Sequence, residues 1–118
     1  MAEKVPLREY PVVVVGGGPA GLACSQQLAK NQIDHIVLEQ GPKPASCWRR
    51  LYSSLTLHTG KHLSTLPDEP FPADTPMFVP KSDFIAYLDH YVSKFSLPIE
   101  CDRKATSLKR DGENWVIE

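Results

Sequence analysis

The sequence predicts an α/β fold of three layers, in which helices pack on a parallel β-sheet. Two observations lead to this fold class. An apolar strand signal, a glycine-rich turn, a helix and a second strand signal follow one another within residues 10–39, and a second amphipathic helix follows at 83–96. Parallel strands need a long crossover connection, which is usually a helix, so this order is typical of a parallel sheet.

The first strand and helix are marked by their end residues. Four consecutive valines at 12–15 stand between Pro11 and Gly16, a pattern typical of a strand buried on both faces. A helix is predicted over 20–30, with Pro19 in its first turn, where a missing N–H costs nothing. The second strand is predicted over 34–39.

Residues 41–80 lack a sustained period and contain seven of the 11 prolines. We expect a long loop region here, with short structured pieces near Leu57 and with Phe71 and Phe78 as apolar anchors. Loops of this length inside a domain are usually functional. Residues 1–9, which have no apolar periodicity, are expected to form a flexible tail.

The C-terminal part predicts a helix, a strand and an antiparallel β excursion. Ser82 is the expected N-cap of the helix at 83–96, and a strand is expected at 98–101. Asp111-Gly112 predicts a hairpin turn between 105–109 and 115–118, with Trp115 packing the hairpin against the sheet. Because the last strand would stop at an unpaired edge, we expect residues 1–118 to be the truncated, N-terminal part of a larger domain.

The composition excludes several functional classes. Thirteen Lys and Arg against 14 Asp and Glu give a net charge of −1, which argues against a nucleic-acid-binding protein. No apolar run approaches the ~18 residues of a membrane span, and the N-terminus lacks a secretory signal. A cytoplasmic protein is therefore expected. Three scattered cysteines predict neither a disulfide framework nor a thiolate metal site, and no other spacing indicates a metal.

The turn after the first strand carries the main functional signal. It reads G-x-G-x-x-G over six residues that we assign to cofactor binding: Gly16, Gly17, Gly18, Pro19, Ala20 and Gly21. In this motif the first glycine permits a tight turn, the second lets the backbone approach a diphosphate, and the third allows close helix–strand packing. The helix N-terminus adds aligned N–H donors and a partial positive charge. The motif and its context predict a Rossmann-like FAD/NAD(P)-binding fold.

Glu39 narrows the choice of dinucleotide. It lies 23 residues after Gly16, at the end of the second predicted strand, where a carboxylate can accept hydrogen bonds from ribose hydroxyls. A carboxylate would repel a ribose 2′-phosphate, so FAD or NAD is expected here rather than NADP. The order Gly18-Pro19-Ala20-Gly21 resembles FAD-binding halves of flavoprotein oxidoreductases and favours FAD.

Four later segments extend the resemblance. They are 46–50 (SCWRR), 52–61 (YSSLTLHTGK), 66–72 (LPDEPFP) and 84–88 (FIAYL). Their sequences and order resemble the flavin-containing monooxygenase family of class B flavoprotein monooxygenases, nearest its YUCCA-like branch. The resemblance extends from about residue 10 to 118. The resemblance implies an enzyme in which NADPH reduces FAD, O2 forms a C4a-(hydro)peroxyflavin, and one oxygen atom passes to a small-molecule substrate.

The resemblance also implies roles for single residues. Trp48 would flank the FAD diphosphate and ribityl chain, although a core aromatic is the alternative interpretation. Leu57 and the candidate catalytic His58 would lie near the isoalloxazine, and Ala105 would present its backbone to the adenine. Gln40 is assigned to the cofactor site beside Glu39. Many family members have asparagine where this chain has His58.

The chain lacks a second G-x-G-x-x-[GA] motif, so the NADPH site is not expected within residues 1–118. This fragment alone is therefore expected to be inactive. Two alternative functions remain open from the sequence. One is an FAD-dependent oxidoreductase of another type, and the other is a non-catalytic dinucleotide-binding module.

Overall fold

A computed structural model describes residues 7–118 of the chain. Its central sheet has three parallel strands in the order β1-β2-β5, formed by Val12–Val15, His35–Leu38 and Ile99–Glu100. The helix α1 (Pro19–Lys30) connects β1 to β2, and α3 (Lys81–Phe95) leads into β5. The parallel sheet and the strand–helix–strand unit predicted from the sequence are confirmed.

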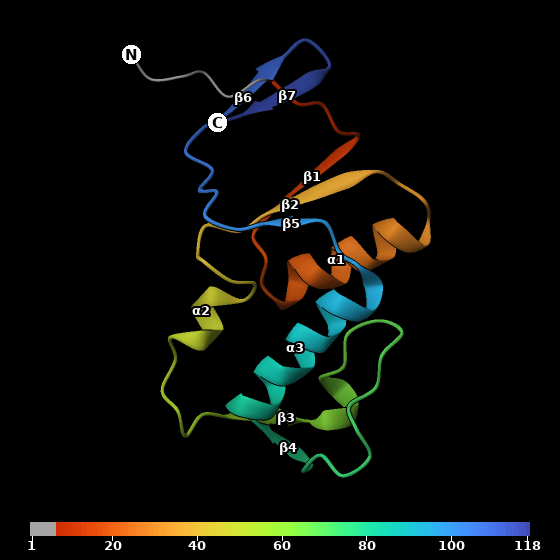
Figure 1. The fold of residues 1–118 in the computed structure, drawn as a ribbon, viewed down its shortest axis with the longest axis vertical. Helices are drawn as coiled ribbons and strands as arrows, with labels where there is room; N and C mark the ends of the chain where they lie inside the picture. The colour runs from red at the N-terminus through yellow and green to blue at the C-terminus, as the bar shows by residue number, and fades with distance from the viewer. Residues whose placement is uncertain (1–6) are drawn as a thin grey trace.

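The layers are visible in Figure 1. The hairpin of β6 (Leu108–Asp111) and β7 (Asn114–Ile117) lies on one side of the sheet, and α1 and α3 lie on the other. The antiparallel pair β3 (Thr56–Gly60) and β4 (Phe78–Pro80) lies beyond the helices. The three-layer α/β fold with an antiparallel excursion is therefore confirmed.

The hydrophobic core lies between the helices and the segment that precedes α3. Leu22 of α1, Val79 of β4 and Leu88 and Tyr91 of α3 are completely buried in it. Helical spacing explains this arrangement, since apolar residues three and four apart share one face of α3. Each buried leucine or tyrosine contributes roughly 1.5–3 kcal/mol through the hydrophobic effect.

The first strand is less buried than its four valines predict. Val12, Val13 and Val14 are only half-buried, and Val15 is 60% exposed. The reason is topological, because β1 pairs with β2 and occupies an edge of the described sheet. An apolar run shows that a strand is suited to burial on both faces, but its neighbours decide whether that burial occurs.

The long loop region at 41–80 contains four short elements. They are α2 (Ser46–Arg49), β3, the 3-10 turn η1 (Lys61–Leu63) and β4. Phe71 is buried, as predicted, but the expected anchor Phe78 is 53% exposed. Phe78 pairs through its backbone with Gly60, and its neighbour Val79 is the residue that points into the core.

Tyrosines of α3 hold the proline-rich part of this loop. The Tyr87 hydroxyl donates to the carbonyl oxygen of Glu69 at 2.7 Å and accepts from the N–H of Leu66 at 2.8 Å. The Tyr91 hydroxyl donates to the carbonyl oxygen of Pro67 at 2.9 Å. Burial raises the pKa of both phenols. These bonds satisfy loop backbone groups that strands or helices would otherwise have to pair.

Three predicted details are wrong. Helix α3 begins at Lys81 with Pro80 as its N-cap, so Ser82 does not cap it. The hairpin loop is Gly112-Glu113, one residue later than predicted, with Gly112 at φ +63°. Trp115 does not pack against the sheet but is 57% exposed, with the Arg110 guanidinium 5.0 Å from its ring centroid. Stacking with a neighbour on the same hairpin replaces the expected packing.

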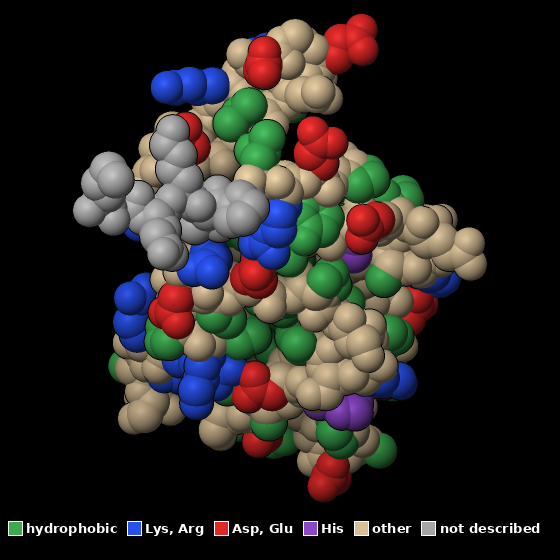
Figure 2. Space-filling model, turned by 45° about the horizontal axis from the view of Figure 1, so that its top comes forward, with side chains coloured by type: hydrophobic (Ala, Val, Ile, Leu, Met, Phe, Trp, Pro, Cys, Tyr) green, Lys and Arg blue, Asp and Glu red, His purple; other side chains and the backbone are tan. Residues whose placement is uncertain are grey.

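Residues 1–6 of the predicted tail lie outside the described residues. Within 7–9, Arg8 forms an ion pair with Glu100 of β5. No helix within residues 7–118 is long and apolar enough to cross a membrane. On the face shown in Figure 2, basic and acidic side chains lie interspersed.

Candidate functional site

The glycine turn connects the end of β1 to the start of α1. Gly16 has φ +106°, a left-handed conformation that favours glycine, and its N–H donates to the carbonyl oxygen of Leu38 at 2.8 Å. Gly18 is the N-cap of α1, and its carbonyl oxygen accepts the N–H of Leu22 at 2.9 Å. The turn is therefore fixed at one end to β2 and at the other to the first turn of the helix.

The absence of a side chain permits close packing at Gly21 and leaves an open surface at Gly18. A Cβ atom on Gly21 would lie 1.9 Å from the carbonyl oxygen of Gly16, so the helix can approach the turn only because residue 21 has no side chain. A Cβ on Gly18 would meet nothing within 4 Å. Gly18 therefore leaves open the surface in front of the helix N-terminus, where the first N–H groups of α1 have no partner within the helix.

Glu39 is buried and holds the turn through both carboxylate oxygens. Its Oε1 accepts the N–H of Gly17 at 3.0 Å, and its Oε2 accepts the N–H of Gly41 at 2.6 Å. Each carboxylate oxygen has a second lone pair, which leaves acceptor capacity for a ligand hydroxyl. The carboxylate thus lies beside the glycine turn, as the sequence predicts, and it also supports that turn.

These groups form a surface suited to an adenine dinucleotide. The open helix N-terminus offers N–H donors and positive potential to a diphosphate, and the neighbouring carboxylate offers acceptors to a ribose diol. Gln40, which follows Glu39, is exposed. The residues present therefore fit the ADP half of FAD.

Trp48 belongs to α2, which packs between the glycine turn and α3. The N–H of Ala45, just before α2, donates to the carbonyl oxygen of Gly17 at 2.8 Å. The Trp48 ring meets the Phe84 ring edge-on with centroids 4.9 Å apart, and Trp48 is only half-buried. Trp48 therefore packs on the core and still has an exposed part.

Leu57 and His58 lie on β3, in the part of the molecule beyond α3 in Figure 1. Leu57 is half-buried and packs against the core, whereas His58 is exposed. Alternation of side chains along a strand explains why neighbouring residues point to opposite faces. The described contacts do not join His58 to the glycine turn.

Residues that the sequence did not single out also contribute to the site. The N–H of Arg103 donates to the carbonyl oxygen of Glu39 at 2.9 Å, which brings the segment leading to Ala105 beside the backbone of Glu39. Ala105 itself is half-buried. Gly41 is also required, since a Cβ there would lie 2.2 Å from Ser46 Oγ. A glycine two residues after Glu39 was the available sequence signal for this contact.

Cys101 lies in the same region, and burial raises the pKa of its thiol, with the Glu39 and Asp102 carboxylates acting in the same direction. A raised pKa disfavours the thiolate, so Cys101 is poorly suited to be a nucleophile. The three cysteines Cys24, Cys47 and Cys101 are all free.

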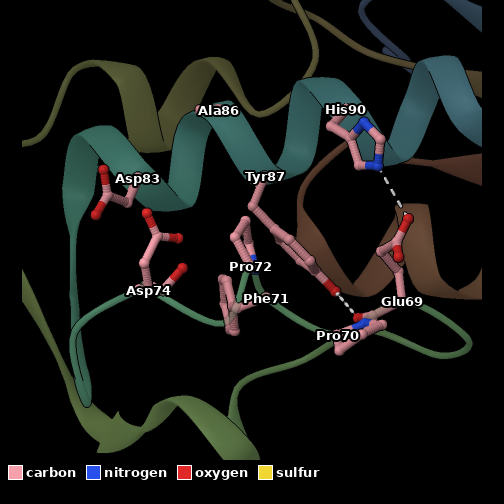
Figure 3. A pocket seen from close by; sticks show the side chains of 10 residues that line it. Glu69, Pro70, Phe71, Pro72, Asp74, Asp83, Ala86, Tyr87 and His90 are labelled. Atoms are coloured by element: carbon pink, nitrogen blue, oxygen red, sulfur yellow. Dashed lines mark hydrogen bonds and ion pairs between the residues drawn. The ribbon is translucent and has the colours of Figure 1, made fainter.

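A separate pocket of about 480 Å³ lies along α3, where the proline-rich loop crosses it. Figure 3 shows Phe71 and Tyr87 between two groups of ionisable side chains, Asp74 with Asp83 at one end and Glu69 with His90 at the other. None of the residues predicted to bind the cofactor lines this pocket. It is therefore distinct from the glycine-turn surface.

Comparison with known proteins identifies a matching family and similar sequences. Residues 13–118 match the family described as pyridine nucleotide-disulphide oxidoreductase. The chain is 39% identical over 106 residues to the indole-3-pyruvate monooxygenase YUCCA4 of Oryza sativa subsp. japonica, covering 89% of this chain and 24% of that protein. It is also 39% identical over 112 residues to the probable indole-3-pyruvate monooxygenase YUCCA10 of Arabidopsis thaliana, covering 92% and 29%. The chain thus spans about a quarter of the length of these relatives.

Solved structures show the same fold. A flavin-containing monooxygenase from Stenotrophomonas maltophilia aligns with a TM-score of 0.84 and 27% identity, over 92% of this chain and 33% of that one. A bacillithiol disulfide reductase from Bacillus cereus aligns with a TM-score of 0.87 and 22% identity, over 93% and 33%, and shows the fold alone. The resemblance to flavin-containing monooxygenases, nearest the YUCCA-like branch, is confirmed.

Proposed function

Because this chain belongs to the pyridine nucleotide-disulphide oxidoreductase family, we propose that it is the FAD-binding part of an NADPH-dependent flavoprotein monooxygenase. Its similarity to YUCCA and other flavin monooxygenases supports the reaction type, in which one oxygen atom of O2 passes to a small-molecule substrate. The observation that carries the proposal is the pairing of an open helix N-terminus at Gly18 with the carboxylate of Glu39.

The chain's own residues divide the work of binding. The turn at 16–21 binds the FAD diphosphate through backbone N–H groups, and Glu39 accepts hydrogen bonds from the adenosine ribose. The exposed part of Trp48 flanks the ribityl chain, Leu57 and His58 lie near the flavin ring, and the segment at Ala105 lines the adenine. When bound by these residues, FAD would supply the chemistry with O2, and NADPH bound outside residues 1–118 would supply the electrons.

A binding experiment on the 118-residue chain tests this assignment. Titration with FAD, followed by tryptophan fluorescence and calorimetry, should show weak saturable binding that ADP competes for, because ADP carries the groups that the glycine turn and Glu39 recognise. A 2′-phosphorylated adenosine nucleotide should compete poorly, because Glu39 repels the added phosphate. The absence of both FAD and ADP binding would refute the proposal.

A second measurement tests the division between the two cofactors. With excess FAD, the chain should consume NADPH no faster than free FAD does, because the NADPH site is proposed to lie outside these residues. Consumption clearly above that blank would show that the catalytic unit is smaller than proposed.

A further inference from the structure

Helix α2 is held at its two ends by different parts of the chain. Before its first residue, the N–H of Ala45 donates to the carbonyl oxygen of Gly17 in the glycine turn, at 2.8 Å. At its other end, Lys81 Nζ donates to the carbonyl oxygen of Arg49 at 2.8 Å and also to that of Leu51. The short helix therefore connects the diphosphate turn to the start of α3.

Lys81 also holds the strand that carries His58. Its backbone N–H donates to the carbonyl oxygen of Leu55 at 2.8 Å, immediately before β3 begins at Thr56. The neighbouring residue Pro80 pairs with Thr56 in the β3–β4 ladder. One residue thus fixes both the C-terminal end of α2 and the entry to β3.

Two side-chain contacts complete the attachment of α2 to α3. The Trp48 ring packs edge-on against the Phe84 ring, three residues after Lys81, with centroids 4.9 Å apart. The Arg49 guanidinium pairs with the Asp89 carboxylate at 2.5 Å. The ion pair is partly exposed and contributes little, whereas the Arg49 carbonyl that Lys81 satisfies is one that a helix end cannot pair by itself.

We propose that Lys81 is a positioning residue that sets the placement of Trp48 and of the strand bearing Leu57 and His58 relative to the glycine turn. It controls how the flavin half of FAD is held and leaves the ADP half to Gly18 and Glu39. The proposal rests on the proposed function, because it requires that FAD is the ligand. Lys81 itself need not touch the cofactor.

The test compares FAD and ADP binding in variants of the 118-residue chain. Lys81→Met keeps the length of the side chain and removes its donors, and it should weaken FAD binding about tenfold while ADP affinity stays within about twofold. The visible absorption band and the fluorescence quenching of bound FAD should also move toward those of free FAD. Lys81→Arg, which keeps donors at similar reach, should restore both.

Lys94→Met is the matched control. It removes a lysine from the other end of α3, where Nζ pairs with Glu69 at 2.8 Å, and should leave FAD affinity and flavin spectrum unchanged. If Lys81→Met does not fold, the milder Lys81→Gln carries the same comparison, with retained ADP binding as the sign of an intact glycine turn.

The outcomes separate the two proposals. A wild-type chain that binds neither ligand would overturn the proposed function and this inference together. A Lys81→Met variant with wild-type FAD affinity and flavin spectrum would overturn only the inference. Equal losses of FAD and ADP affinity would also overturn it, because Lys81 would then support the fold as a whole.

Discussion

The backbone N–H of Gly17 donates to the carboxylate of Glu39 at 3.0 Å and so links the glycine turn to the end of β2. The same carboxylate accepts the N–H of Gly41 at 2.6 Å. A residue assigned to ribose recognition from its sequence position therefore also holds the glycine turn. Because Glu39 has both roles, substitutions at this position should change the stability of the fold as well as the affinity for FAD.

Replacing Glu39 with alanine should destabilise the chain by about 2–3 kcal/mol, because two N–H groups lose a charged acceptor. It should also weaken FAD binding, by about 1.5–3 kcal/mol, through the lost ribose hydrogen bonds. Urea unfolding and FAD titration measure the two effects separately. Glu113→Ala, in the exposed hairpin loop, should change stability by less than about 0.5 kcal/mol. Wild-type FAD affinity in a folded Glu39→Ala variant would exclude the ribose contact.

Alanine at Gly21 should lower the stability of the fold, whereas alanine at Gly18 should lower the affinity for ADP. Gly21→Ala should destabilise the fold by roughly 1–3 kcal/mol, although alanine normally favours a helix, because its Cβ would lie 1.9 Å from the Gly16 carbonyl oxygen. Gly18→Ala should stay close to wild-type stability, since its Cβ meets nothing within 4 Å, but it should block the approach of a diphosphate. Thermal unfolding and ADP titration distinguish the pair, and unimpaired ADP binding by Gly18→Ala would place the diphosphate elsewhere.

The Glu69 carboxylate should make stability depend on pH in the acid range. Hydrogen bonds from Lys94 and then His90 lower its pKa below the ordinary value of 4.5, against the opposing effect of partial burial. Its contribution is therefore fully present above pH 4.5 and is lost as the pH falls through the lower, folded-state pKa. Glu69→Gln should reduce the difference between urea midpoints measured near neutral pH and at acid pH.

Asp74→Asn is the control for this comparison, because Asp74 is an exposed carboxylate on the same loop. Asp74→Asn should show the same difference between the urea midpoints at neutral and at acid pH as the wild-type chain. If Glu69→Gln also kept the full difference, the ion pairs with Lys94 and His90 would not stabilise the fold.

In a flavoprotein that contains this chain and an NADPH site, His58 should influence how much of the consumed O2 is released as hydrogen peroxide. The exposed position on β3 suits a side chain that faces the flavin ring. His58→Ala should shorten the lifetime of the oxygenated flavin and increase the hydrogen peroxide released per NADPH consumed. His58→Asn, which keeps a hydrogen-bond donor and is the residue that the family resemblance implies here, should preserve coupling. Stopped-flow absorbance and a peroxide assay check this, and unaltered coupling in His58→Ala would remove His58 from the reaction.

The sequence by itself determined the first strand, helix and second strand, the glycine turn within this unit, and the helix α3. Four valines, a glycine motif and a helical stripe are local patterns, and each is read over a few residues without knowledge of partners. The order of β1, α1 and β2 follows because a parallel pair needs a crossover helix. For the same reason Glu39 could be placed beside the glycine turn from spacing alone.

Tertiary structure decided which of the side chains in those patterns are buried and which backbone groups pair. Val15 is exposed because β1 lies at an edge of the described sheet, and Trp115 stacks with Arg110 because the hairpin lies apart from the helices. The links that hold the site together, from the N–H of Ala45 to Gly17 and from Lys81 Nζ to Arg49, both end on backbone carbonyl groups distant in sequence. Every residue carries such backbone groups, so no residue pattern marks these pairs in advance, and only the folded chain brings them together.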